Sequence, residues 1–284
     1  YMTVKGDFTN ISGTITFDNN NSSTIAHILS INGEKFTIGG QAVINNVVAT
    51  ANPIYGTIYF DRSGLTSYYE NSSSAKVQNI KQVISSGCTV RIASGNMQSS
   101  STNYLVPDMI KVSSGGILDA GTRQIYSNAV NLYSGITVSN GGKIKTAHAE
   151  GLYNGTANAT IKANSNMNYI LWPLSTIEYN GTVNQVISGT GVGTAQTTDQ
   201  QYGVLTINKL SGVAKLNASG VVVRKALDLN TGELQLNGYN LTVASGATNA
   251  ITTNEGYIKS ETNASIQNGL VIWKNIVQGS HTIP

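Results

Sequence analysis

The stretch Gly116-Ile117-Leu118-Asp119-Ala120-Gly121-Thr122-Arg123-Gln124-Ile125 matches Gly232-Glu233-Leu234-Gln235-Leu236-Asn237-Gly238-Tyr239-Asn240-Leu241 without a gap. In each stretch an apolar pair two residues apart precedes a two-residue turn that contains glycine, and another apolar residue follows. Apolar residues at every second position are typical of a strand with one buried face. The match therefore indicates short strands that are joined by tight turns.

A second similarity relates neighbouring parts of the chain. Residues 139–144 (Ser-Asn-Gly-Gly-Lys-Ile) resemble residues 113–118 (Ser-Ser-Gly-Gly-Ile-Leu), which lie about one repeat earlier. Repeats of roughly 20 to 30 residues are typical of coils that stack on one another rather than of one closed globule.

Helical periodicity is nearly absent, whereas runs of β-branched and aromatic residues recur along the chain. Most runs are three to six residues long and are bounded by Gly, Asn, Ser or Asp, which favour turns. The predicted strands lie at residues 14–17, 28–31, 36–38, 42–44, 57–60, 77–84, 89–92, 109–112, 117–120, 136–138, 143–147, 160–163, 169–172, 176–179, 204–208, 221–229, 233–236, 241–244, 257–260 and 270–276.

The polar residues of this chain are mostly uncharged. It contains 32 Asn but only 14 Asp plus Glu, and charged residues make up 11% of 284 positions. That share is less than half of the usual quarter. Uncharged polar side chains can support a dense backbone ladder without placing like charges on stacked neighbours.

Two all-β architectures fit this pattern. A parallel β-helix (β-solenoid) uses nearly every backbone N–H in its ladder, and the chain has only four prolines. An antiparallel β-sandwich is the alternative, because Asn-Gly pairs, which favour hairpins, occur at residues 32, 154, 180, 237 and 268. We predict the β-helix, with imperfect coils of roughly 20–30 residues.

We expect residues 1–284 to form one continuous solenoid segment of a longer chain, since both ends of the sequence look cut. Residues 1–105 are less regular than residues 106–284. We interpret residues 67–74, 98–103 and 188–196 as loops that leave the coil stack, not as linkers between domains.

The sequence offers few residues for metal chemistry. His27, His148 and His281 are more than a hundred residues apart, and none has a His or Cys at ligand spacing. No calcium-binding loop or nonapeptide is present. We therefore predict no metal site and no cofactor.

Glycan-cleaving solenoids need carboxylates gathered on one face. Five aspartates have no acidic neighbour within three positions: Asp61, Asp108, Asp119, Asp199 and Asp228. Glu150, close to His148, gives the nearest approach to a polar cluster, and we interpret it as part of a corner turn with a hydrogen-bonded histidine. We predict no catalytic residue, although stacked coils could bring distant carboxylates together.

Other candidate features have simple structural interpretations. Cys88 is expected to be a small buried residue of the strand 88–92. The glycine-rich residues 189–193 lack the following Lys-Ser/Thr of a phosphate-binding loop. Tyr68, Tyr69 and Tyr153 could stack on sugar rings if they are exposed, but tyrosine is also a common strand residue. Whether the chain binds a ligand, and through which residues, stays unknown from the sequence.

Asn-x-Ser/Thr sequons indicate glycosylation only if the source is eukaryotic. They include those at Asn10, Asn71, Asn154, Asn158, Asn217, Asn240 and Asn263.

The net charge of +3 is spread over single Lys and Arg residues, with no cluster of four. We therefore expect no nucleic-acid partner. No run of eighteen apolar residues is present, so no membrane-spanning segment is predicted.

Six stretches within residues 77–284 share one texture: residues 138–152, 175–186, 202–208, 256–262, 271–274 and 279–284. On these stretches, residues 77–284 resemble long, repetitive surface proteins of Bacteroidetes that are rich in Asn, Gly, Ser and Thr. These proteins usually carry a C-terminal sorting domain read by the type IX secretion system, and most are uncharacterised. The likeness implies a secreted, cell-surface location, contact with the secretion machinery during export, and no particular catalytic residue.

These observations favour a non-enzymatic structural or adhesive segment of a large secreted protein: a stalk, an adhesin or a building block of an extracellular fibre. We expect its partners to be neighbouring domains, further copies of itself, or surface polysaccharide. The alternative is a carbohydrate-binding or glycan-cleaving β-helix. A third interpretation is a surface layer or an ice- or mineral-binding face built from regular Thr ladders, but the chain has no Thr-x-Thr array long enough to support it.

Overall fold

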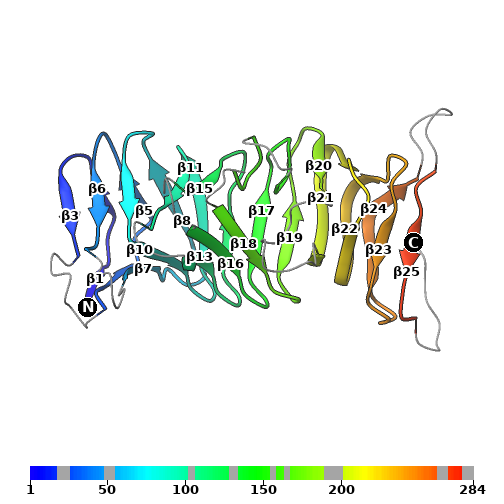
Figure 1. The fold of residues 1–284 in the computed structure, drawn as a ribbon, viewed down its shortest axis with the longest axis horizontal. Coiled ribbons are helices and arrows are strands. Elements are labelled where there is room, and N and C mark those ends of the chain that lie inside the picture. Colours follow the sequence, from blue (N-terminus) through cyan, green and yellow to red (C-terminus); the bar gives the residue numbers. More distant parts are fainter. Residues whose placement is uncertain are drawn as a thin grey trace.

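The computed structural model describes residues 1–17, 26–47, 55–101, 106–127, 134–153, 158–162, 167–188, 201–260 and 268–276. The fold is all-β, and its sheets are built from parallel strand pairs, as the β-helix prediction required. The strands stack along an elongated rod with the N-terminus at one end and the C-terminus at the other (Figure 1). The sandwich alternative is therefore wrong.

The strands are short up to β20, and the long strands are β21, β22 and β24. In chain order the strands are β1 (Met2–Val4), β2 (Phe8–Asn10), β3 (Thr14–Thr16), β4 (Ile28–Ile31), β5 (Lys35–Ile38), β6 (Val43–Asn45), β7 (Gly56–Phe60), β8 (Thr66–Asn71), β9 (Lys76–Gln78), β10 (Ile80–Ile84), β11 (Thr89–Ser94), β12 (Met97–Ser99), β13 (Val106–Val112), β14 (Ile117–Asp119), β15 (Ile125–Ser127), β16 (Ser134–Val138), β17 (Lys143–Thr146), β18 (Met167–Leu171), β19 (Thr176–Tyr179), β20 (Gln185–Ile187), β21 (Gln201–Leu216), β22 (Val221–Gln235), β23 (Leu241–Val243), β24 (Ile251–Lys259) and β25 (Val271–Trp273).

Each turn of the chain contributes to three faces. The first face is a seven-stranded sheet in the order β1-β4-β7-β10-β13-β16-β18, and the second is part of a 13-stranded sheet that follows β2-β5-β8-β11-β14-β17-β19-β21. The third face contains the small sheets β3-β6-β9 and β12-β15. A single strand, β21, bends from one face to the next, since it pairs with β19 in its first half and with β20 at its end.

The length of a coil follows from the strand register. Val223 pairs with Val243, which is 20 residues later, whereas Ile136 pairs with Tyr169, which is 33 residues later. The predicted range of about 20–30 residues is therefore nearly right. Corners of variable length absorb the difference, because the strands themselves must stay aligned for the ladder to continue.

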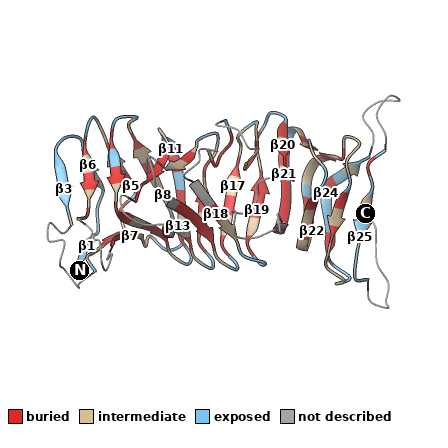
Figure 2. Cartoon of the chain, viewed as in Figure 1, coloured by how far each residue is buried: buried red, intermediate tan, exposed pale blue. Residues whose placement is uncertain are grey.

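The core is a narrow apolar column that runs along the rod. On the second face Leu118, Ile144, Ile177, Leu205 and Leu227 occupy successive coils in register, and none is exposed. Figure 2 shows this buried interior between the exposed ends of the rod. Each such side chain contributes roughly 1.5–3 kcal/mol by leaving water. Aromatic rings continue the column towards the N-terminus, where Phe8 and Tyr69 both stack on Phe36.

The corner between the first two faces repeats from coil to coil. The backbone N–H of Gly115 donates to Gly141 O at 2.9 Å, so the two similar glycine turns of the sequence stack one coil apart. Gly115 has a φ of +75°, and a Cβ there would lie 2.8 Å from the Ser86 hydroxyl oxygen. The positive φ therefore favours glycine, and a larger residue would also displace the Ser86 hydroxyl.

The similarity between residues 116–125 and 232–241 has a different meaning. Both stretches form the same turn, in which Arg123 N donates to Ala120 O and Tyr239 N donates to Leu236 O, each at 2.9 Å. The first turn leads from β14 to β15, and the second from the end of β22 to β23. The match therefore reports a shared local turn used at different corners of the rod.

Asparagine side chains supply hydrogen bonds where the corners interrupt the ladder. Asn140 Oδ1 accepts the backbone N–H of Leu174 at 2.9 Å, and Asn184 and Asn240 accept N–H groups of the following coil in the same way. Asp7 plays this part near the N-terminus, since its Oδ1 accepts the N–H groups of Glu34 and Lys35. The abundance of Asn thus reflects corner chemistry.

Several strand predictions were wrong in detail. Residues 67–74 were interpreted as a loop, but Thr66–Asn71 forms β8, whose alternate side chains are buried. The polar run 98–103 was also assigned to a loop, yet its start belongs to the buried strand β12.

The predicted strand 77–84 is broken at Asn79, which has a φ of +56°. The predicted strands 221–229 and 233–236 are joined in one strand, β22, which ends at Gln235. Within 160–162, only Ile161 makes a single bridge, to Ile125, and residue 163 lies outside the described residues. The neighbouring coil decides whether a segment forms a tight corner or one bent strand. The local sequence pattern contains no information about that coil.

Candidate functional site: the charged row on the second face

A row of polar and charged side chains crosses the outer surface of the second face. Strand pairing places Arg91, Asp119, Lys145 and Glu178 in register on four successive coils, with Thr206 and then Asp228 beyond them. The first four alternate in charge, and adjacent strands lie about 4.8 Å apart. The spacing therefore places opposite charges next to each other on neighbouring coils, which stabilises the stack.

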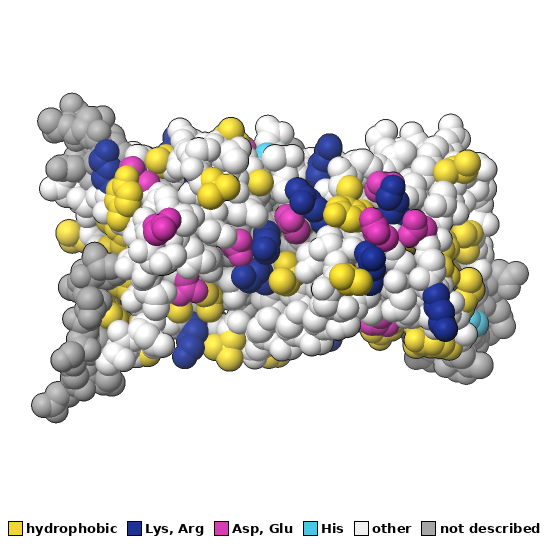
Figure 3. Space-filling view, turned by 180° about the vertical axis from the view of Figure 1, so that it is seen from behind, with side chains coloured by type: hydrophobic (Ala, Val, Ile, Leu, Met, Phe, Trp, Pro, Cys, Tyr) yellow, Lys and Arg dark blue, Asp and Glu magenta, His cyan; other side chains and the backbone are white. Residues whose placement is uncertain are grey.

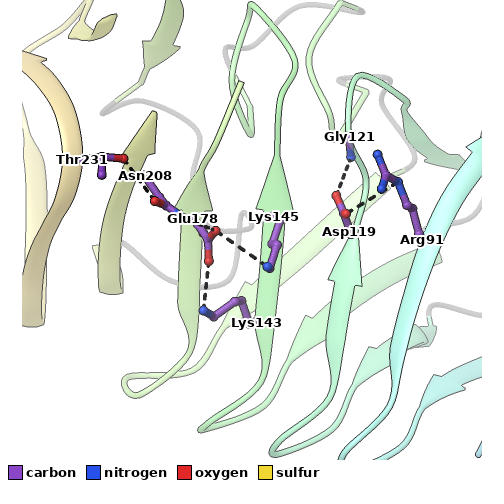
Figure 4. A network of polar contacts seen from close by, with 8 residues as sticks. All are labelled: Arg91, Asp119, Gly121, Lys143, Lys145, Glu178, Asn208 and Thr231. Atoms are coloured by element: carbon purple, nitrogen blue, oxygen red, sulfur yellow. Dashed lines mark hydrogen bonds and ion pairs between the residues drawn. The ribbon is translucent and has the colours of Figure 1, made fainter. Parts of the chain in front are cut away.

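Glu178 is the centre of this row (Figure 4). Its Oε2 accepts Lys143 Nζ at 2.9 Å, its Oε1 accepts Asn208 Nδ2 at 3.0 Å, and Lys145 Nζ lies 3.8 Å from Oε1. Thr231 in turn donates to Asn208 Oδ1 at 3.2 Å. The network therefore spans four coils, from β17 to β22.

Two opposing effects act on the Glu178 carboxyl. Burial raises its pKa, but the hydrogen bonds from Asn208 and Lys143 and the charges of Lys143 and Lys145 outweigh burial, so the pKa lies below its ordinary value. The carboxylate is therefore ionised at neutral pH. Its acceptor positions are used by neighbouring coils, which is the arrangement expected of a structural ion pair.

Other solitary carboxylates also bond to an adjacent coil. Asp108 pairs with Lys81 at 3.1 Å, Asp61 accepts the Ser30 hydroxyl at 2.8 Å, and Asp228 accepts the Thr252 hydroxyl at 2.7 Å. Figure 3 shows acidic and basic side chains interspersed over one surface of the rod. Coil stacking thus distributes these acids and pairs them; Asp199 lies outside the described residues.

Two pairs of carboxylates in this row, Asp119 with Glu178 and Glu178 with Asp228, lie two strands apart, roughly 10 Å. This separation is close to the spacing that inverting glycosidases use. Lys145 lies between Asp119 and Glu178 in the row, and Thr206 lies between Glu178 and Asp228. A general acid also requires a raised pKa, whereas that of Glu178 is lowered. The spacing and the lowered pKa of Glu178 therefore fit a role in holding the coils together better than a role in proton transfer.

The interpretation of His148 and Glu150 as a corner turn is confirmed. Glu150 N donates to His148 Nδ1 at 3.2 Å, and Gly151 N donates to His148 O at 2.9 Å. Burial lowers the pKa of His148, which is therefore neutral at pH 7. His27 lies near the N-terminal end of the rod, and His281 falls outside the described residues.

Within the described residues, no group of three or more His, Cys, Asp or Glu side chains is placed to hold a metal ion. They also contain no helix long and apolar enough to cross a lipid bilayer.

The suggestion that exposed tyrosines stack on sugars fails for Tyr69, which is fully buried within the aromatic column. Tyr153 is half-buried and its ring lies 5.2 Å from that of Tyr169. Only Tyr68 of the three points outward in the charged row, between Lys35 and Arg91, and it too is half-buried. Strand alternation decides this, because neighbouring residues of β8 face opposite sides.

Cys88 is buried, as predicted, but it precedes β11 and does not belong to it. Burial and the nearby charge of Asp61 raise the pKa of its thiol to about 11. The side chain is therefore a poor nucleophile at neutral pH.

The sequons differ in exposure. Asn10 and Asn71 are buried, whereas Asn158, Asn217 and Asn240 are exposed. Asn154, Asn263 and the glycine-rich residues 189–193 lie outside the described residues.

Sequence reasoning missed Lys209. Its side chain is only 2% exposed, and Lys209 and Glu178 are the two buried charged residues among those described. The signal in the sequence was weak, because Asn208-Lys209-Leu210-Ser211-Gly212 has the composition of an exposed turn.

A cavity of about 310 Å³ opens at the N-terminal end of the rod. Its walls include Met2, Phe8 and Ile15, the first members of three inward-facing columns. The cavity therefore lies at the N-terminal end of the described core.

Comparisons of the chain with known protein families, with curated proteins and with solved structures found no match.

Proposed function

We propose that this chain is a non-enzymatic structural or adhesive segment of a large secreted cell-surface protein, serving as a stalk, an adhesin or part of a fibre. The observation that supports it most is the use of polar side chains. Asp108, Asp119 and Glu178 bind neighbouring coils, and corner asparagines such as Asn140 do the same. These side chains, among the described residues, contribute to holding the rod together.

The surface location rests on the resemblance of residues 77–284 to secreted surface proteins of Bacteroidetes. The composition is compatible with it, because a chain with one cysteine has no internal disulfide, and its continuous ladder supplies the rigidity of the rod. The apolar ends of the rod support contacts with neighbouring domains or further copies. Tyr1, Met2 and Ile11 are more than half exposed at one end, as are Leu270 and Ile276 at the other. Apolar surfaces of this kind favour association.

Small-angle scattering on the 284-residue chain tests the structural role. We expect an elongated particle, or end-to-end assemblies as the concentration rises. A compact particle that stays monomeric at all concentrations would count against a rod-like building block.

A glycan array combined with a polysaccharide-degradation screen tests the alternative. The structural role predicts no released oligosaccharide, while an adhesin can still bind a glycan without cleaving it. If oligosaccharides are released, the variants Asp119→Asn and Glu178→Gln identify whether the charged row performs the cleavage. If the wild-type chain releases oligosaccharides and either variant does not, an enzymatic function would replace the structural proposal.

A further inference from the structure

Lys209 lies where β21 bends from the second face to the third. The strand pairs with β19 through Val204–Ile207 and with β20 through Ala214–Leu216, and the register shifts between these two parts. Instead of pointing to solvent, the lysine side chain enters the corner of the coil below.

Three oxygen atoms surround the Lys209 ammonium group. Nζ donates to Gly181 O at 2.6 Å, to Val183 O at 2.8 Å and to Gln185 Oε1 at 2.8 Å. An ammonium group has three N–H donors, so each acceptor receives one. Converging neutral oxygens of this kind also replace the hydration shell of monovalent cations.

The acceptors are themselves fixed by other bonds. Gln185 Oε1 accepts Gly181 N at 2.7 Å, and Gln185 Nε2 donates to Thr146 O at 2.9 Å and to His148 O at 3.1 Å. Gln185 is fully buried. One lysine therefore connects the corner at residues 181–185 to its own coil, and Gln185 extends the connection to the coil of β17.

The coil above also packs closely on this residue. Gly232 has a φ of +87°, and a Cβ there would lie 2.8 Å from Lys209 O and 2.9 Å from Lys209 Cβ. Lys209 thus lies at the change from short strands to the long bent strands β21 and β22.

We propose that Gly181 O, Val183 O and Gln185 Oε1 form a cation site that Lys209 fills from within, and that this internal cation couples the coils up to β20 to those from β21 onward. Burial lowers the pKa of Lys209 to about 8, so the side chain is still an ammonium group at neutral pH. It therefore has three N–H donors, one for each of the three oxygens. This inference concerns the cohesion of the rod and does not depend on its biological role.

Lys209→Met tests the site, because it keeps a long apolar side chain and removes every N–H donor. Gly181 O and Val183 O then lose this donor, and Gln185 Oε1 keeps only Gly181 N, which is costly because most of this corner is buried. We expect unfolding at lower urea, and amide exchange about tenfold faster or more at Gly181 and across β21. Lys215→Met is the matched control, since Lys215 lies on the same strand with a half-exposed side chain. Equal urea midpoints and exchange rates for Lys209→Met and wild type would overturn the proposal.

Lys209→Ala supplies a second test that also works if the variant folds poorly. Propylammonium has the atoms that the alanine variant lacks, so it should restore the urea midpoint or the refolding yield in a saturable manner. Tetramethylammonium, which has no N–H group, should not. Equal effects of the two cations, or no effect of either, would show that the oxygens do not form a cation site.

Discussion

Asn140 Oδ1 accepts a hydrogen bond of 2.9 Å from the backbone N–H of Leu174, which lies 34 residues later and one coil further along the rod. The side chain therefore replaces a backbone carbonyl at a corner, where the strand ladder is interrupted. The same relationship joins Asn184 to Val213 and Asn240 to Leu270. It explains why a chain with few charges contains so many asparagines.

Asn140→Ala removes this acceptor and leaves the N–H of Leu174 to water. Because the bond is exposed, we expect a loss of about 0.5–1.5 kcal/mol in the free energy of unfolding, measured by urea titration. Asn217→Ala is the control, since Asn217 is an exposed asparagine in the turn between β21 and β22. Equal losses for the two variants would argue against a specific role for the corner amide.

Glu178→Gln keeps the shape of the side chain but removes the charge that pairs with Lys143 and Lys145. We expect a loss of about 1–3 kcal/mol at neutral pH, since the carboxylate is buried and hydrogen-bonded. Glu255→Gln, at an exposed position of β24, should change little.

The pH dependence of stability provides a separate check on Glu178. Its folded-state pKa is lowered, so the folded chain binds a proton less readily than the unfolded chain. The stabilisation is therefore complete above the ordinary carboxyl pKa and is lost as the pH falls through the lowered value. Unfolding of wild type and Glu178→Gln should converge in acid; a constant difference at all pH values would contradict this assignment.

Gly115→Ala places a side chain at a φ of +75° and against the Ser86 hydroxyl oxygen. We expect a cost of about 1–3 kcal/mol in the free energy of unfolding. Gly6→Ala is a close control, because no atom lies within 4 Å of the added Cβ and its φ is not positive. Thermal unfolding of both variants measures the difference, and a Gly115 variant as stable as the Gly6 variant would refute it.

The Cys88 thiol should resist alkylation in the folded protein. A pKa raised from 9.0 to about 11 lowers the thiolate fraction at pH 8 by about a hundredfold. Mass spectrometry after iodoacetamide treatment should find the native chain unmodified and the urea-unfolded chain alkylated. Rapid labelling under native conditions would place Cys88 at an accessible position.

Local sequence patterns predicted the strands whose residues alternate strictly, such as Lys143–Thr146 and Thr176–Tyr179. They failed for Thr66–Asn71, a polar and tyrosine-rich segment that looks like a loop. Its pairing with β5 and β11 decides its conformation, since both neighbours offer free backbone groups to an extended chain. A single sequence contains no information on that register.

The candidate site was less predictable than the fold. Each acidic residue could be identified as solitary in the sequence, but its partner lies 27 to 35 residues away in the examples of Lys81–Asp108 and Lys143–Glu178. Coil lengths vary, so the spacing between partners is not constant and no fixed-period search would find them. Lys209 was hidden for the same reason, because its acceptors are 24 to 28 residues earlier.

The amino-acid sequence by itself determined that the chain is all-β, that its turns are tight and that it repeats at the length of a solenoid coil. These properties follow from side-chain volume, β-branching and the backbone freedom of Gly and Asn, which act within a few residues. Only the tertiary structure decided that Asp119, Lys145 and Glu178 share one row and that Lys209 is buried among carbonyl oxygens. Register between coils fixes such contacts, and it depends on the summed length of every corner before them.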